Sequence, residues 1–230
     1  MKYRNLFFDL DDTIWAFSRN ARDTFEEVYR KYSFERYFDS FDHYYTIYQQ
    51  RNTELWIEYG EGKITKDELN WQRFSYPLQA VGVEDETLAE KFSEDFFAII
   101  PTKSGLMPYA KEVLEYLAPK YNLYILSNGF RELQSRKMRS AGVDIYFKKV
   151  ILSEDLGVLK PWPEIFNFAL SATQSELRES LMIGDSWEAD ITGAHGVGMH
   201  QAFYNVTERT AFPFLPTYHI HSLKELMDLL

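Results

Sequence analysis

The sequence predicts an α/β protein in which helices cover both faces of a parallel sheet and an all-helical segment is inserted near the start. Short apolar runs alternate with helical patterns from about residue 101 onward, whereas residues 18–100 contain helical patterns alone. Strands that alternate with helices usually pair in parallel and are buried on both faces. We therefore expect a core of residues 1–17 and 101–230, with a helical domain at residues 18–100 inserted in it.

The core begins with Asn5-Leu6-Phe7-Phe8, a buried strand that runs directly into acidic residues. The apolar and aromatic residues 14–17 then predict a loop or hairpin. The later core elements are expected to be a helix from Pro108, a strand at 121–127, a helix at 131–141, a strand at 149–153, a helix at 163–173, a strand at 180–184, a helix through Ile191, a strand at 199–204 and a helix at 223–230.

The inserted segment is rich in aromatic residues at helical spacing. Ser18 is expected to be the N-cap of its first helix, and Thr65-Lys66-Asp67-Glu68 has the form of a capping box. A further helix is predicted at residues 84–100. The aromatic side chains could stack on a nucleobase, but their spacing favours a role in the core of this segment.

Composition bounds the classes of function. The chain has 230 residues, of which 45% are hydrophobic, so it can bury a sizeable core. Its 35 acidic and 25 basic residues argue against binding to a nucleic acid polymer, although a small phosphorylated ligand needs only a locally positive pocket. There is no cysteine, and no apolar run suits a signal peptide or a membrane span. These features predict a soluble, cytoplasmic protein that has no membrane partner.

Acidic residues stand where the first strand ends, at Asp9, Asp11 and Asp12. On an extended backbone, Asp9 and Asp11 would point to the same side and Asp12 to the other. Two adjacent carboxylates push one pKa upward, so one can be an ionised nucleophile and the other a proton carrier. The alternative is an ordinary acidic turn.

Three more polar sites follow predicted strands or lie in loops. Ser127-Asn128-Gly129 offers a hydroxyl and backbone N–H groups that could hold a phosphate, Lys160 precedes a proline, and Gly184-Asp185 is followed by Asp190. Each has a structural alternative: a turn, a solvated lysine, and a helix N-cap at Asp185 or Ser186. Their common position where strands or loops end favours a shared site.

Taken together, these residues resemble the haloacid dehalogenase-like superfamily of phosphohydrolases. The resemblance lies in four ordered motifs that span residue 7 to about residue 200, namely Asp9-x-Asp11-x-Thr13, Ser127, Lys160 with Pro161, and Gly184-Asp185 with Asp190. It implies a Rossmann-like core with a helical cap. Asp12 departs from the pattern, because many members have Gly there. Asp12-Thr13-Ile14-Trp15 and Ser127-Asn128-Gly129-Phe130 look like the subgroup that hydrolyses nucleoside 5′-monophosphates.

The resemblance also implies residue roles. Asp9 would attack phosphorus to form an aspartyl-phosphate, Asp11 would act as acid and base, and Lys160 would complete the catalytic set. The expected phosphate-binding residues are Thr13, Ser127, Asn128 and Gly129. The expected Mg²⁺ ligands are Asp9, the backbone carbonyl of Asp11 and Asp185, with Asp190 acting directly or through water.

Charge balance supports a cation independently of the family. Asp9, Asp185 and Asp190 would meet a phosphate monoester that carries about 1.5 to 2 negative charges. Each like-charge contact at ~4 Å costs about 4 kcal/mol at an intermediate dielectric. Lys160 supplies one positive charge, and Mg²⁺ suits the remaining oxygen ligands.

We expect a small phosphorylated substrate, with Trp15 and Phe17 as candidate contacts because they follow the catalytic strand. His219 and His221 lack a third ligand, so we interpret them as structural. A phosphomutase would use the same two acids, and a non-catalytic binding protein could keep the fold. A haloacid dehalogenase would also use Asp9, but that family lacks a carboxylate at the Asp11 position. The sequence does not specify the substrate or the oligomeric state.

Overall fold

The computed structural model describes residues 2–230. Contacts within the chain define two compact units, Met1–Ser18 with Ser104–Leu230 and Arg19–Lys103. We call the first the core unit and the second the helical unit. Within residues 2–230, no helix combines the length and the apolar character that crossing a bilayer requires.

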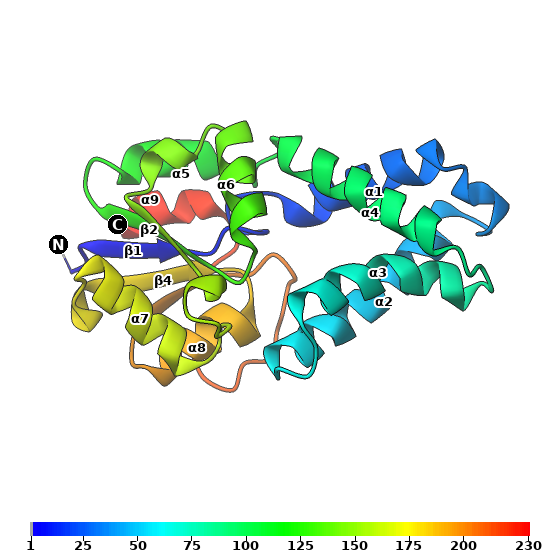
Figure 1. The fold of residues 1–230 in the computed structure, drawn as a ribbon. Coiled ribbons are helices and arrows are strands. Elements are labelled where there is room, and N and C mark those ends of the chain that lie inside the picture. Colours follow the sequence, from blue (N-terminus) through cyan, green and yellow to red (C-terminus); the bar gives the residue numbers. More distant parts are fainter. Residues whose placement is uncertain (1) are drawn as a thin grey trace. The chain divides into compact units, whose positions relative to one another are not determined.

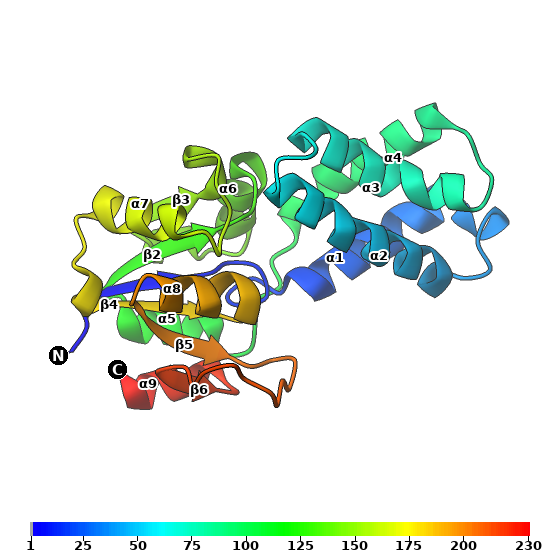
Figure 2. The same cartoon turned by 90° about the horizontal axis from the view of Figure 1, so that it is seen from below.

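The core unit is built on one six-stranded sheet with all neighbouring strands parallel, in the order β3-β2-β1-β4-β5-β6. Figure 2 shows β1, which is blue, between β2 and β4. The strands are β1 Asn5–Phe8, β2 Asn122–Ser127, β3 Lys149–Leu152, β4 Ser180–Gly184, β5 His200–Tyr204 and β6 Tyr218–Ile220. The fold class is as predicted, and β6 is an additional edge strand.

Helices cover both faces of this sheet (Figure 1). One face carries α7 and α8, and its buried cluster joins Phe7, Tyr124 and Met182 of the strands to Ile165 and Phe166 of α7. The opposite face carries α5 and α9. The helices of the core unit are α5 Ala110–Leu117, α6 Arg131–Ser140, α7 Pro163–Thr173, α8 Thr192–Gly196 and α9 Leu226–Leu229, with the short turns η3 Asp144–Tyr146, η4 Ser153–Asp155, η5 Leu177–Glu179, η6 Trp187–Ile191 and η7 Leu223–Glu225.

The helical unit contains no strand among its described residues, as predicted. Its elements are α1 Phe17–Lys31, whose first two residues belong to the core unit, η1 Phe34–Arg36, α2 Phe41–Gly60, α3 Lys66–Ala80, α4 Glu86–Ile99 and η2 Ile100–Thr102. The capping box of Thr65 and Glu68 opens α3 as expected. Phe25 lies at the centre of an aromatic core, with ring centroids 4.1 Å from Tyr48 and 4.3 Å from Phe96.

Two predicted helix starts are wrong. Ser18 is not an N-cap, because α1 begins one residue earlier at Phe17. The N–H and hydroxyl of Ser18 instead donate to the Asp12 carboxylate, at 2.9 and 2.6 Å. The helix expected from Pro108 begins at Ala110, because Tyr109 has a left-handed backbone with φ 64°.

Candidate active site

The acidic residues gather at the carboxyl end of the central strands. β1 pairs with β2 and with β4 in register, so Phe8 lies beside Ile125 on one side and Ile183 on the other. Asp9 follows β1, and its backbone N–H donates to the carbonyl of Ile183 at 2.9 Å. Asp185, which follows β4, is thereby brought to the same edge of the sheet, where open α/β sheets bind ligands.

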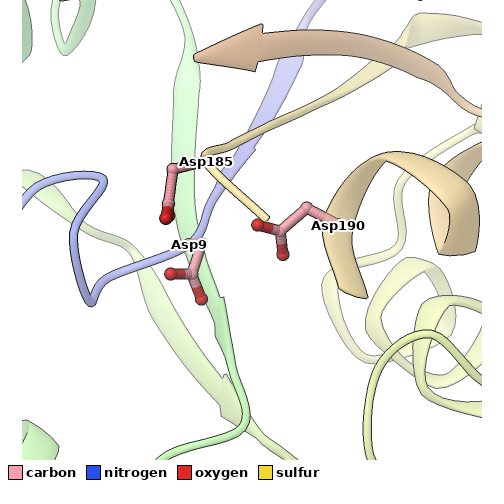
Figure 3. Close-up of side chains that lie close together, drawn as sticks. All are labelled: Asp9, Asp185 and Asp190. Carbon is pink, nitrogen blue, oxygen red and sulfur yellow. The ribbon is translucent and has the colours of Figure 1, made fainter. Parts of the chain in front are cut away.

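Three carboxylates form a compact group at this edge. Asp9, Asp185 and Asp190 each offer an oxygen, and these atoms all lie within 4.8 Å of one another. Figure 3 shows the three side chains converging, with Asp190 coming from the helical segment η6 that follows β4. Gly184 leaves room for Asp190, since a Cβ at that position would lie 2.1 Å from Asp190 Oδ2.

Lys160 is the buried cation of this group. Its Nζ donates to Asp9 Oδ1 and to Asp190 Oδ1, both at 2.6 Å, and to the carbonyl of Leu126 at 2.8 Å. Burial alone would lower the pKa of Lys160, but the charges of Asp190 and Asp9 outweigh it and raise that pKa. Lys160 therefore stays protonated and neutralises about one of the three acids.

The remaining negative charge is held at a cost. Burial, with Asp190 and Asp11 nearby, raises the pKa of Asp9 to about 7 despite Lys160. Burial, with Asp9 and Asp190 nearby, raises the pKa of Asp185 to about 8. A hard divalent cation with oxygen ligands would relieve this repulsion, so the three carboxylates fit the Mg²⁺ expected from the sequence.

Thr13 supports the carboxylate of Asp185. It is fully buried, its hydroxyl donates to Asp185 Oδ1 at 2.8 Å, and the same oxygen accepts from the Asp185 N–H at 3.1 Å. Phosphate binding by Thr13 was expected, but both of these contacts commit its hydroxyl to Asp185. We assign Thr13 to positioning the Asp185 carboxylate.

The segment after β2 holds the lysine loop. The Asn128 side chain accepts from the Lys160 N–H at 2.8 Å and donates to the Lys160 carbonyl at 3.1 Å. Ser127 Oγ accepts from the Gly129 N–H at 3.1 Å and from Gln134 Nε2 at 2.8 Å. With both of these contacts accepted, the Ser127 hydroxyl retains its own proton to donate to a phosphate oxygen.

Asp11 is held by two residues that the sequence reasoning missed. Lys137 Nζ lies 2.9 Å from Asp11 Oδ1 and 3.2 Å from Oδ2, and Gln134 Nε2 donates to Oδ2 at 2.9 Å. Both come from α6. Their i, i+3 spacing indicates a shared helix face, but no sequence signal indicates that this face meets Asp11. The Asp12 carboxylate instead accepts from Ser18, and the backbone of Asp12 is left-handed, with φ 57°, rather than extended as predicted.

The aromatic residues after the catalytic strand lie differently from expectation. Trp15 is fully buried, so the structure does not support it as a direct substrate contact. Its ring lies 6.3 Å from that of Phe17, and Lys137 Nζ lies over both rings. Phe17 is half-buried. His219 lies in β6, hydrogen-bonds to Asn205 and stacks on Phe203, and its ring centroid is 4.6 Å from that of His221. The structural role of the two histidines stays a prediction.

Comparison with known proteins agrees with this geometry. HAD-hydrolase YfnB of Bacillus subtilis is 33% identical over 100% of this chain and 96% of its own length. The pyrimidine 5′-nucleotidases YjjG of Escherichia coli and PynA of Streptococcus pneumoniae are each 31% identical over 100% of this chain and over 99% and 96% of theirs.

A crystal structure of B. subtilis YfnB bound to magnesium superimposes with a TM-score of 0.88 at 29% identity, covering 100% of this chain and 99% of that one. The family model of haloacid dehalogenase-like hydrolases matches residues 3–198. This match covers strands β1 to β4, the helical insert and all four motifs. The chain therefore belongs to the haloacid dehalogenase-like hydrolases, as its motifs predicted.

Proposed function

We propose that this chain is a Mg²⁺-dependent phosphatase that hydrolyses small phosphate monoesters through an aspartyl-phosphate on Asp9, with nucleoside 5′-monophosphates as the first substrates to test. The observation that carries the proposal is the convergence of Asp9, Lys160, Asp185 and Asp190 at one sheet edge, from three distant parts of the chain. The fully intact set argues against a non-catalytic binding protein.

Asp9 is the nucleophile in this account. Lys160 holds one of its oxygens, so the carboxylate presents a fixed orientation to phosphorus. In the first step a bond forms between an Asp9 oxygen and phosphorus, while the bond from phosphorus to the ester oxygen breaks. Asp11 gives its proton to that leaving oxygen.

In the second step water attacks phosphorus and gives a proton to Asp11, and the bond between Asp9 and phosphorus breaks. Ser127, with backbone N–H groups near Asn128 and Gly129, would bind the transferring oxygens, where negative charge must be stabilised. Asp9, Asp185 and the backbone carbonyl of Asp11 would hold Mg²⁺. Asp190 would bind the ion directly or through a water molecule. When bound, the ion supplies positive charge against the phosphoryl oxygens.

The substrate class is proposed from the relatives. Two of them are pyrimidine 5′-nucleotidases, and both span the whole of this chain, including its helical unit. We propose that residues 18–100 act as the cap that selects the substrate, and that half-buried Phe17 contacts it. Another relative is the glyceraldehyde 3-phosphate phosphatase of Pyrococcus abyssi, so glyceraldehyde 3-phosphate should be tested in the same substrate screen.

The test is a measurement of inorganic phosphate release from nucleoside 5′-monophosphates, sugar phosphates and small phosphorylated acids, with Mg²⁺ and with a chelator. We expect Mg²⁺-dependent release, strongest with a pyrimidine nucleoside 5′-monophosphate, and no need for a bisphosphate activator. Release that persists after chelation contradicts the metal requirement. Transfer of the phosphoryl group to a sugar, without phosphate release, would indicate a phosphomutase.

A further inference from the structure

Two buried polar side chains of α6, Gln134 and Lys137, reach the carboxylate of Asp11. Gln134 is fully buried and Lys137 is 3% exposed. Lys137 contacts both oxygens of Asp11, and Gln134 contacts one of them. Because both oxygens of Asp11 accept hydrogen bonds from these donors, one orientation of its carboxylate is favoured.

Asp11 is the acid that forms an ion pair with Lys137, although the charge of Lys137 also acts on the nearby Asp12. Within residues 2–230 its only ion pair is with Asp11, and its Nζ lies 4.8 Å from the ring centre of Trp15 and 5.0 Å from that of Phe17. Burying an ammonium group is costly, and an apolar side chain of similar volume often packs at least as favourably. Packing alone therefore does not account for a lysine here. Its charge is directed at Asp11.

Gln134 links Asp11 to the phosphate-binding side of the site. Its Nε2 donates both to Asp11 Oδ2 at 2.9 Å and to Ser127 Oγ at 2.8 Å, while its Oε1 is buried without a hydrogen-bond partner. Gly129 provides the space, because a Cβ there would lie 2.1 Å from Gln134 Nε2. A buried carbonyl without a hydrogen-bond partner is destabilising, so the two hydrogen bonds of the Gln134 NH₂ group, to Asp11 and Ser127, are the reason for a glutamine here.

We propose that Lys137 and Gln134 are positioning residues that direct the Asp11 carboxyl group toward the leaving oxygen and, later, toward the attacking water. This inference rests on the proposed function, in which Asp11 is the acid and base. Neither residue reacts with the substrate. Lys137 sets the direction of the carboxylate, and Gln134 keeps Asp11 and Ser127 at a fixed separation.

The inference predicts a dependence on the leaving group. A nucleoside leaves as an alkoxide that needs a proton, whereas p-nitrophenolate is stable without one. In Lys137→Met, kcat/KM for a nucleoside 5′-monophosphate should fall about 10- to 100-fold, but kcat/KM for p-nitrophenyl phosphate should stay within about threefold of wild type. Gln134→Met keeps the volume, loses the amide, and should show the same pattern more weakly.

Matched variants separate positioning from folding. Arg139→Met removes a charge from the exposed side of the same helix and should leave both substrates unaffected, while Lys137→Arg should restore part of the lost rate. In an Asp11→Asn background, adding Lys137→Met should change the nucleoside reaction by no more than about twofold, because the two residues act through one group. Melting temperatures of all variants report their folding.

Several results would overturn the inference. They are an equal loss on both substrates in a folded Lys137→Met, no loss, a gain in rate, or full additivity with Asp11→Asn. If Lys137→Met does not fold, the same outcomes for Gln134→Met decide the question. Failure of the proposed function is distinct, because wild-type protein would then release phosphate from neither substrate with Mg²⁺.

Discussion

At the scale of single residues, the site is a problem of buried charge. Lys160 has a side chain 2% exposed and lies between Asp9 and Asp190, so one cation serves two acids. Asp185 accepts a hydrogen bond from the hydroxyl of Thr13, which is a neutral group. The three carboxylates of the site therefore exceed its one lysine. This imbalance favours the binding of a cation, and the bound cation in turn favours the binding of an anionic substrate.

This imbalance predicts how pH and Mg²⁺ act together. The folded pKa values of Asp9 and Asp185, about 7 and about 8, lie above the ordinary value of about 4. As pH rises from about 4 to about 8, the unfolded chain releases these protons first, so these groups make metal-free protein less stable as pH increases. Mg²⁺ binds the ionised carboxylates, so its stabilising effect should grow over the same range.

Thermal unfolding with and without Mg²⁺ at about pH 6 and about pH 8.5 checks this expectation. We expect a larger Mg²⁺-induced rise in melting temperature at the higher pH. Asp185→Asn removes one of the titrating acids, so it should stabilise metal-free protein at high pH and reduce its response to Mg²⁺. An equal Mg²⁺ response of wild type at both pH values would contradict the account.

At the scale of elements, close packing at strand ends places the acids. Gly184 is the last residue of β4, and the Asp190 carboxylate packs where a Cβ of residue 184 would lie. Gly129, which follows β2, leaves room for the Gln134 side chain in the same manner. The absence of a side chain, rather than a special backbone angle, is what these two positions require. Helix α6 then presents Gln134 and Lys137 to Asp11 on one face.

The closeness at β4 gives a direct prediction for Gly184→Ala. The added Cβ must displace Asp190 Oδ2, and Lys160 with it, because both residues are buried and hydrogen-bonded. We expect phosphatase activity to fall about 100-fold and the Mg²⁺ concentration for half-maximal activity to rise. Gly196→Ala in α8 is the control, since a Cβ there meets nothing within 4 Å. Similar kinetics for the two variants would show that Gly184 does not set the position of Asp190.

Elements with a strong local signal were predicted closely from the sequence. The bounds of α7 and β4 are those expected, and the capping box of α3 is present. Elements set by tertiary contacts were not. Ser18 looked like an N-cap, but Asp12, six residues earlier, accepts its N–H. The edge strand β6 was not predicted, and it pairs in parallel with β5.

At the scale of the whole molecule, ordered motifs predicted the site because a parallel sheet brings strand ends together. Asp9, Ser127 and Asp185 therefore stand at the neighbouring carboxyl ends of β1, β2 and β4. The sequence could not show which helix face meets which loop, so Gln134 and Lys137 were missed, and Trp15 was expected at the substrate although it is buried. The hydrogen-bond partners of the Thr13 hydroxyl and the Asn128 side chain could not be predicted from the sequence either. These partners, Asp185 and Lys160, are distant in the sequence.

The central claim is that Asp9 accepts the phosphoryl group, and trapping that intermediate tests it most directly. Wild-type protein turning over a nucleoside 5′-monophosphate with Mg²⁺ is quenched in acid, reduced with borohydride, and digested for mass spectrometry. We predict that residue 9 is converted to homoserine, and that Asp9→Asn gives neither this product nor phosphate release. Homoserine at another position, or phosphate release by Asp9→Asn near the wild-type rate, would contradict the account.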